Sequence, residues 1–379
     1  MYDTEQAVEG RTSIAGRVTL VHDYLLVMRG AERTFAAIAE LYAQAPIFTL
    51  LYDQHGTNDR FADRAIVTSP LQRLGVSQAN FRRLLPLYPW AVSHLELPPS
   101  DVVLSSSSAF AHGVHAPAGA LHICYCYTPF RYAWYEEERA LGETPRVLRA
   151  LLRSQLRRIR RWDLAASHRV HEYIAISQLS RTRIKRYYGR DARVVHPPVE
   201  THRFSPGTPG EKLLLVSEIV RHKRLQVALE AARRAGAPIR VVGSGPDHLA
   251  LSRAYPEAEF VGRASDEQLA ELYASARAVI VPSMEEFGIT AVEAQAAGRP
   301  VIAAAAGGAL ETVLDGETGL LAKLGEVDDF VRAIRGIDAL DFDPERAVAN
   351  AERFSVAAFQ RRLAAEIEAT VQRNVASRA

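Results

Sequence analysis

The chain has 379 residues, of which 48% are hydrophobic and 24% charged, and its formal net charge is +2. This length favours two domains over one core, and so small a net charge excludes nucleic acid as the general partner. No apolar run approaches the roughly 20 residues of a membrane span. The acidic, polar residues 1–13 do not resemble a signal peptide. We therefore expect a cytoplasmic protein.

Short apolar strands alternate with helices in the first half. A strand at 17–25 leads through a turn at Arg29 and Gly30 into a helix at 31–44. Such alternation is typical of a parallel sheet covered on both faces. Pro197 and Pro198 end the pattern because proline continues neither a helix nor a central strand, so we place a domain boundary near residue 205. The other predicted strands lie at 45–53, 101–108, 120–129, 171–177 and directly after residue 190.

Both cysteines, Cys124 and Cys126, lie in the predicted strand 120–129. One residue apart in a strand, their side chains point to the same face. They are too close for easy disulfide geometry, and no second group of Cys or His completes a metal site. The pattern predicts buried thiols in a reducing compartment and no bound metal.

A long helix is predicted over 145–166, and it is rich in arginine. Leucine and isoleucine side chains recur on it at helical spacing, and seven arginines between Arg146 and Arg161 cover its other faces. A basic amphipathic helix can lie on an anionic membrane surface. The alternative is a solvated face over a packed apolar stripe.

Strands and helices alternate more regularly in the second half. About six strand–helix repeats fill residues 206–352, which predicts a doubly wound parallel sheet. Ser265 and Gln268 have the spacing of a capping box at the start of one helix. The last segment, 353–379, is predicted to be an amphipathic helix that packs back toward the first domain.

A turn with two carboxylates, Glu285 and Glu286, follows the predicted strand at 277–283. In doubly wound sheets, ligands bind outside the carboxyl ends of the strands. The free N–H groups of Gly288, Ile289 and Thr290 would form a diphosphate site at a helix N-terminus. Glu285 would lie beside the group attached to the diphosphate. Glu293 could accept hydrogen bonds from the two hydroxyls of a ribose. The alternative is that acidic residues near a helix start only offset the helix dipole.

Several motifs together resemble the GT-B-fold glycosyltransferases of family 4, in particular their bacterial mannosyltransferase-like branch. The spacing of Glu285 and Glu293 is that family's E-x7-E pattern, and similar segments run from VHDYL through YCYTPFRYAW, HPPVETHRF and VVGSGP to GGALETV. The resemblance implies two Rossmann-like domains that face a central cleft. Residues 1–205 would bind the acceptor and residues 206–352 the nucleotide sugar.

The family resemblance also implies a reaction, which is retaining, metal-independent transfer of a hexose from a nucleoside-diphosphate sugar, with GDP-mannose as the best single donor. Glu285 would contact the sugar, Glu293 the ribose and Lys223 the diphosphate, with the base near Gly262 and Arg263. The leaving phosphate would take the acceptor proton, so the protein's task is positioning and charge stabilisation. The residues expected at the reacting centre are Glu285, Tyr127 and Lys223. The expected donor-binding set is Gly30, Lys223, Gly243, Gly262, Arg263, Glu285, Phe287, Gly288, Ile289 and Glu293.

Three positions depart from the family pattern. Glu218 stands where an arginine usually contacts phosphate, and a carboxylate there opposes an anionic ligand. Tyr127 replaces a histidine and does not titrate near neutral pH. Arg29 and Gly30 replace paired glycines, and the arginine adds a positive charge. These changes point to an altered donor geometry or to lost transferase activity.

The acceptor contacts expected in the first domain are Arg29, His112 and Arg131. A lone histidine such as His112 is more often structural, and Arg131 could meet an anionic acceptor group or form a core salt bridge. The acceptor would be a glycan, a lipid-linked molecule or a small molecule. Other functions stay open on this fold. They are a tailoring glycosyltransferase that uses another donor, a non-catalytic nucleotide-sugar-binding protein, and a phosphorylase or sugar-phosphate synthase.

Overall fold

The computed structural model describes residues 16–75, 77, 78 and 80–378, which form two compact units. Of the described residues, the N-terminal unit contains those within 16–176, 180–195 and 360–378, and the C-terminal unit contains 177–179 and 196–359. The chain enters the C-terminal unit at His196, before the expected boundary at 205. The reason is that the Val199 N–H donates to the Phe354 carbonyl at 2.8 Å, which ties this segment to the C-terminal unit.

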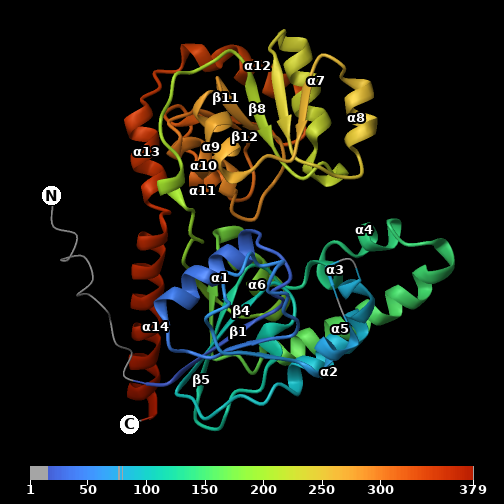
Figure 1. The fold of residues 1–379 in the computed structure, drawn as a ribbon, viewed down its shortest axis with the longest axis vertical. Coiled ribbons are helices and arrows are strands. Elements are labelled where there is room, and N and C mark those ends of the chain that lie inside the picture. The colour runs from blue at the N-terminus through green and yellow to red at the C-terminus, as the bar shows by residue number, and fades with distance from the viewer. Residues whose placement is uncertain (1–15, 76, 79, 379) are drawn as a thin grey trace. The chain divides into compact units, whose positions relative to one another are not determined.

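The N-terminal unit is built on a seven-stranded parallel sheet in the order β3-β2-β1-β4-β5-β6-β7, with helices on both faces (Figure 1). The expected alternation of strands and helices is present. The edge strand β3 was not predicted, because its three residues are half-exposed and lack an apolar run. The strands are β1 (Val18–His22), β2 (Ile47–Thr49), β3 (Ile66–Thr68), β4 (Val102–Ser107), β5 (Leu121–Cys126), β6 (Glu172–Ala175) and β7 (Ala192–Val194).

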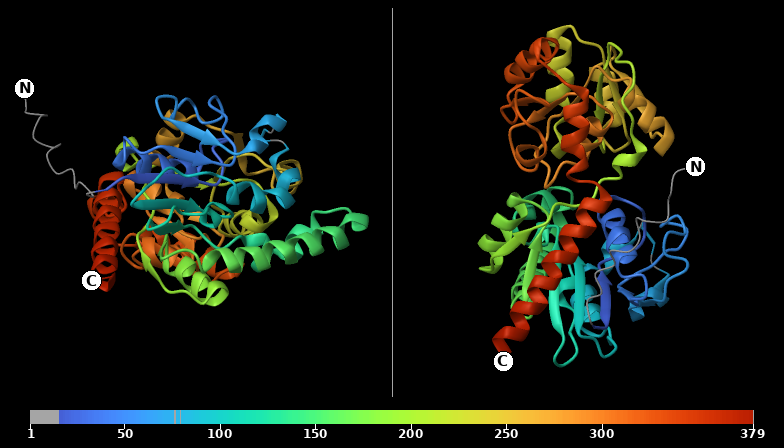
Figure 2. Two further views of the ribbon diagram at one scale, coloured as in Figure 1. Left: turned by 90° about the horizontal axis from the view of Figure 1, so that it is seen from below. Right: turned by 90° about the vertical axis from the view of Figure 1, so that its left-hand side faces the viewer.

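The helices of this unit differ greatly in length. The predicted arginine-rich helix forms as a short 3-10 turn, η4 (Arg146–Leu148), followed by α5, and the arm that α4 and α5 make stands out from its own sheet (Figure 2). Leu156 and Ile159 pack in the core, as the spacing predicted. The α-helices are α1 (Gly30–Leu41), α2 (Tyr88–Ser93), α3 (Arg131–Trp134), α4 (Glu137–Gly142), α5 (Arg149–Ser167), the part of α6 (Gln178–Tyr188) from Ser180 onward and the part of α14 (Val356–Arg378) from Gln360 onward.

The C-terminal unit has a six-stranded parallel sheet in the order β10-β9-β8-β11-β12-β13 (Figure 1). This confirms the predicted doubly wound sheet. Its strands are β8 (Leu213–Val216), β9 (Ile239–Val242), β10 (Glu259–Gly262), β11 (Ala278–Val281), β12 (Val301–Ala304) and β13 (Gly319–Ala322). Its helices are α7 (Leu225–Ala235), α8 (His248–Ala254), α9 (Asp266–Ala274), α10 (Ile289–Ala296), α11 (Ala309–Thr312), α12 (Val327–Gly336) and α13 (Pro344–Glu352).

Several smaller predictions can be checked against these elements. The capping box of α9 is present, since Gln268 N–H donates to Ser265 Oγ at 3.2 Å and Ser265 N–H to Gln268 Oε1 at 3.0 Å. Cys124 and Cys126 are buried free thiols in β5. Within the described ranges, no helix is long and apolar enough to cross a membrane.

Candidate active site

Glu285 and Lys223 meet at the carboxyl end of the C-terminal sheet. The strand order reverses between β8 and β11, and open α/β sheets bind ligands at such a point. Lys223 follows β8 and Glu285 follows β11, and Lys223 Nζ lies 2.6 Å from Glu285 Oε2. Ser283 Oγ donates a hydrogen bond to the other carboxylate oxygen. The lysine and glutamate side chains are 25% and 21% exposed, so a ligand can reach both.

An open helix N-terminus adjoins this pair. Gly288, the N-cap of α10, has φ +89°, a conformation that favours glycine because it has no Cβ. In the part of the chain that the structure describes, the N–H groups of Ile289 and Thr290 have no acceptor. Two such N–H groups and the helix dipole suit a phosphate. Phe287 is buried and packs against the Phe354 ring with centroids 5.3 Å apart, which holds the turn in place.

Glu293 lies inside α10 and is partly buried. The hydroxyl of Tyr273, from α9, donates to Glu293 Oε2 at 2.7 Å. Burial, followed by the charge of Glu293, raises the pKa of Tyr273 well above its ordinary value, so the phenol stays a donor. This hydrogen bond ties the Glu293 carboxylate to α9.

Glycines allow the loops around this site to pack backbone against backbone. A Cβ on Gly243 would lie 1.8 Å from the Ser217 carbonyl oxygen, and one on Gly308 would lie 1.9 Å from the Phe287 carbonyl oxygen. The Gly308 N–H also donates to the Glu285 carbonyl at 2.9 Å. The loops that carry Ser217 and Glu285 are thus braced by their neighbours in the sheet.

The loops after β9 and β10 meet near the expected base site. Arg263 Nε donates to Ser244 Oγ at 2.8 Å, and Gly262 has φ +81° at the end of β10. Arg263 is exposed, so its guanidinium can reach a ligand. Gly262 and Arg263 thus lie where the loops after β9 and β10 meet, at the carboxyl end of the sheet.

Glu218 lies on the loop after β8 and is exposed. Among the described residues its carboxylate has no ion pair or hydrogen bond. The same loop continues into η6 (Arg221–Lys223), so Arg221 and Lys223 place two cations within one turn. Exposure lets water solvate the Glu218 charge, which weakens its repulsion of an anion.

The polar groups at the carboxyl end of the N-terminal sheet are used within the protein. Asp23, after β1, is buried and accepts hydrogen bonds from the N–H groups of Ser108, Phe110 and Ala111 at 2.6 to 2.8 Å. These bonds hold the loop after β4. The sequence motif VHDYL contains Asp23, but nothing in its spacing marked it as a structural carboxylate.

Tyr127 is buried at the end of β5. Its hydroxyl donates to the Ala31 carbonyl at 2.8 Å and lies 3.0 Å from Ser106 Oγ. Burial raises the pKa of Tyr127 far above its ordinary value. A hydroxyl bonded to the start of α1 positions that helix, which argues against the predicted place of Tyr127 at the reacting centre.

His112 is likewise part of the core, with 3% of its side chain exposed. Its Nε2 lies 3.2 Å from Asp163 Oδ1, and Asp163 also accepts from Trp134 Nε1 at 2.6 Å and from the Tyr188 hydroxyl at 2.8 Å. Burial acts to lower the pKa of His112, but the hydrogen bond and charge of Asp163 outweigh it and raise the pKa. A side chain enclosed in this way does not offer the predicted acceptor contact.

The remaining acceptor candidates lie near the start of two helices. Arg29 is the exposed N-cap of α1, directly before Gly30, and its N–H donates to Glu32 Oε2 at 3.1 Å. Burial raises the pKa of Glu32 to about 7. Arg131 is the first residue of α3 and is half-buried.

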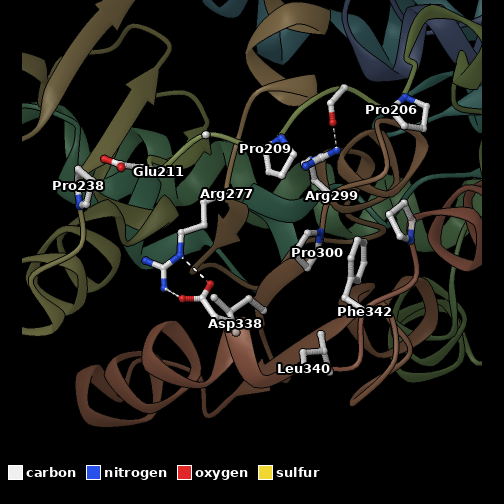
Figure 3. A pocket seen from close by; sticks show the side chains of 14 residues that line it. Pro206, Pro209, Glu211, Pro238, Arg277, Arg299, Pro300, Asp338, Leu340 and Phe342 are labelled. Atoms are coloured by element: carbon white, nitrogen blue, oxygen red, sulfur yellow. Dashed lines mark hydrogen bonds and ion pairs between the residues drawn. The ribbon is translucent and has the colours of Figure 1, made fainter.

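A pocket lies at the opposite, amino end of the C-terminal sheet (Figure 3). Pro238, Arg277 and Pro300 line it just before strands begin, and its volume is about 800 Å³. The Arg277 guanidinium is paired with Asp338 at 2.7 Å. Because ligands of such sheets bind at the carboxyl ends, this pocket is not the donor site.

Comparison with known proteins identifies one part of the chain. Residues 199–354 match the family model described as Glycosyl transferases group 1. This segment is therefore similar to group 1 glycosyltransferase domains. D-inositol 3-phosphate glycosyltransferase 2 of Catenulispora acidiphila is 35% identical over 222 residues, 48% of this chain and 52% of that protein. The Rhodococcus erythropolis D-inositol 3-phosphate glycosyltransferase is 34% identical over 184 residues, 40% of this chain and 42% of that protein. The chain thus spans about half the length of the curated relatives it matches.

Solved structures extend the similarity over both units. HepE from Anabaena, in complex with UDP, has a TM-score of 0.68 at 18% identity and covers 93% of this chain and 100% of its own. Sucrose-phosphate synthase from Thermosynechococcus elongatus has a TM-score of 0.68 at 18% identity, and the match covers 95% of this chain and 100% of the synthase chain. At this identity the likeness establishes the fold, which confirms two parallel α/β sheets of the GT-B kind.

Proposed function

We propose that the protein is a retaining glycosyltransferase that takes a hexose from a nucleoside-diphosphate sugar. The observation that carries this proposal is the meeting of Lys223 and Glu285 beside the open N-terminus of α10. A cation and free N–H groups suit a diphosphate, and a partly exposed carboxylate suits sugar hydroxyls. In the reaction, the bond between the sugar and the diphosphate breaks while the acceptor oxygen bonds to the same carbon. The acceptor proton passes to the departing phosphate, so the protein needs no nucleophile of its own.

GDP-mannose is the donor that we propose to test first. The resemblance to the mannosyltransferase-like branch supports it, whereas HepE was solved with UDP and with UDP-glucose, which makes the uridine sugars the second choice. We propose that the acceptor is a glycan or a lipid-linked molecule. D-inositol 3-phosphate belongs in the acceptor panel because the curated relatives carry its name.

The deciding experiment combines thermal shift with turnover. We expect one nucleoside diphosphate among GDP, UDP and ADP to raise the melting temperature, because a ligand of the native state stabilises it. We expect the matching sugar nucleotide to be consumed, and Glu285→Gln to lower kcat/KM by about 100- to 1,000-fold. No shift with any nucleotide would overturn the donor site. A shift without turnover would indicate a non-catalytic nucleotide-sugar-binding protein.

We also propose that α5 makes a peripheral contact with an anionic membrane, which is where a lipid-linked acceptor would lie. Glu137 of α4 neutralises one side of α5. Its carboxylate lies 2.7 Å from the Arg160 guanidinium and 3.6 Å from Arg153 Nε. Arg157, Arg158 and Arg161 are exposed, and no partner of theirs is present in the described ranges. Cations left unpaired on one side suit lipid phosphates.

Apolar side chains accompany these cations at the start of the helix. Val147 is 87% exposed, Leu148 48% and Leu151 59%. The sequence predicted that Leu148 and Leu151 pack against the core as part of the apolar stripe. They are exposed instead, because the start of α5 extends beyond the core. Exposed apolar residues beside unpaired arginines are typical of helices that lie in a membrane interface.

Vesicle sedimentation tests this contact. We expect binding to vesicles of phosphatidylglycerol and phosphatidylcholine, loss of binding in high salt, and little binding to phosphatidylcholine alone. Changing Arg157, Arg158 and Arg161 to glutamine should weaken binding by about 100-fold, because three charges at roughly 1 kcal/mol each amount to about 3 kcal/mol. The matched control changes Arg253, Arg361 and Arg362, which are also exposed. Equal binding by both triple variants would contradict the proposal.

A further inference from the structure

The pocket at the amino end of the C-terminal sheet contains a buried arginine without a counter-charge. Arg299 precedes β12 and is 5% exposed. Its Nε donates to the Ala297 carbonyl at 3.3 Å, and its Nη2 donates to the Gly207 carbonyl. Among the residues that the structure describes, no carboxylate pairs with Arg299 and Nη1 has no acceptor. Because a guanidinium has five N–H donors, one end of this group is left unused.

Arg64 of the N-terminal unit shows how a purely structural arginine is satisfied. Its Nη1 and Nη2 donate to the carbonyls of Ala39, Tyr42 and Ala45 at 2.7 to 2.9 Å, so the fold uses both ends of the guanidinium. Arg299 is more deeply buried, yet only one of its two terminal nitrogens is used. Burial lowers the pKa of Arg299, the direction expected for a cation that leaves water without a partner.

The other charges that line the pocket leave Arg299 as its unpaired cation. Arg277 is neutralised by Asp338, whose carboxylate lies 2.7 Å from Arg277 Nη2 and 3.0 Å from Nε. Glu211 is exposed, so water screens its charge. In Figure 3 the Glu211 side chain points away from Arg299. One unpaired cation suits a ligand with a single negative charge, whereas a phosphate monoester carries nearly two.

Rigid apolar side chains form much of the remaining wall. Five prolines, Pro209 and Pro300 among them, line the pocket together with Leu340 and Phe342. Proline loses almost no side-chain entropy when a ligand covers it. The volume of about 800 Å³ lies in the range of small-molecule sites, which are typically apolar with a few polar groups that fix the ligand's orientation.

We propose that this pocket binds a small monocarboxylate with an apolar body. The carboxylate meets the unused end of the Arg299 guanidinium, and the apolar body lies against the prolines and Phe342. Arginine suits this role because its planar fork matches the geometry of a carboxylate. Lys223 and Glu285 lie at the opposite end of the sheet, so this site goes beyond the proposed function and does not depend on it.

The probe is naphthoate, because its flat rings and single charge match the pocket. We expect a titration of the full chain, followed by ligand-observed NMR, to give a Kd of about 1 mM or below. Naphthamide keeps the rings without the charge, and acetate keeps the charge without the rings. Each should bind at least about tenfold more weakly than naphthoate. An excess of GDP or UDP should leave naphthoate binding unchanged.

The first variant is Arg299→Met, which removes the charge and keeps most of the stem. We expect its affinity for naphthoate to fall at least about tenfold, to the level of naphthamide, while Arg299→Lys loses less because it keeps the charge. The matched control is Arg64→Met, which removes a half-buried arginine that does not line the pocket. It should bind naphthoate as the parent does.

A second pair of variants leaves the buried arginine in place. Pro209 lines the pocket from an exposed loop, so its replacement does not disturb the core. Pro209→Glu adds a carboxylate that repels the probe and competes for Arg299, whereas Pro209→Gln has the same size without the charge. We expect Pro209→Glu to bind naphthoate about tenfold more weakly than Pro209→Gln.

Several results would overturn the proposal. They are an absence of naphthoate binding by the parent protein, equal affinities for naphthoate and naphthamide, and undiminished binding by Arg299→Met. Displacement of naphthoate by GDP or UDP would place the probe in the donor site and would also overturn it. If Arg299→Met shows no cooperative unfolding transition, the Pro209 pair decides, and equal affinities of its two members would contradict the proposal.

Discussion

The two units place polar side chains at the same topological position but use them differently. Asp23 follows β1 of the N-terminal sheet, and Asp163 lies on α5, where it reaches His112 after β4. Both are buried and accept several hydrogen bonds from their own unit. At the strand ends of the C-terminal sheet, Lys223 and Glu285 remain partly exposed, and the N–H groups of Ile289 and Thr290 have no acceptor among the described residues. Groups that are satisfied internally stabilise the fold, whereas groups left open can bind a ligand.

The comparison therefore separates two kinds of mutational effect. A polar substitution in the N-terminal set should act mainly on the free energy of unfolding. One in the C-terminal set should act mainly on nucleotide binding and turnover. A buried charge that loses its partners costs several kcal/mol, while an exposed pair contributes little.

The largest expected effect on stability belongs to Asp163→Ala. It would leave His112 without its buried partner and would remove the acceptor of Trp134 Nε1 and the Tyr188 hydroxyl. We expect the free energy of unfolding in urea to fall by about 3–5 kcal/mol. The matched control is Asp191→Ala, at an exposed pair with Arg181, which should change stability little. Comparable losses in the two variants would contradict the structural role of Asp163.

A second, smaller effect concerns Glu32 and depends on pH. Burial raises the pKa of Glu32 from 4.5 to about 7, so between these values the folded protein holds a proton that the unfolded chain has released. The free energy of unfolding therefore falls as pH rises through this window. Glu32→Gln lacks this loss, and its stability relative to the parent should rise by up to about 3 kcal/mol between pH 5 and pH 8. A stability difference that stays constant between these two pH values would refute the shifted pKa.

The smallest expected effect on stability is that of Gly288→Ala, at the N-terminus of α10 in the candidate donor site. A Cβ at φ +89° strains the backbone, at a cost of about 1–2 kcal/mol. The same change should greatly weaken nucleotide binding, because it displaces the N–H groups that follow. Gly336→Ala, at the end of α12 with ordinary backbone, is the control and should be neutral. Unchanged nucleotide affinity in Gly288→Ala would contradict the assignment of the α10 N-terminus as the diphosphate site.

Much of the fold could be predicted because periodic apolar runs report burial directly. The doubly wound C-terminal sheet and the capping box at Ser265 follow from local spacing. The edge strand β3 and the helix α13 could not be found in this way, because the first is half-exposed and the second has hardly any large apolar side chains. The arginine-rich helix was predicted with one stripe, yet only its later turns are covered by the core.

The candidate site divides along the same line. The sequence by itself determined that Glu285, Gly288 and Glu293 follow one strand end, because they are neighbours along the chain. Only the tertiary structure brought Lys223 to Glu285 and Tyr273 to Glu293, because these pairs join separate loops and helices. It likewise enclosed His112 and Tyr127 in the core. Burial depends on what packs against a residue from distant parts of the chain, and no local pattern contains that information.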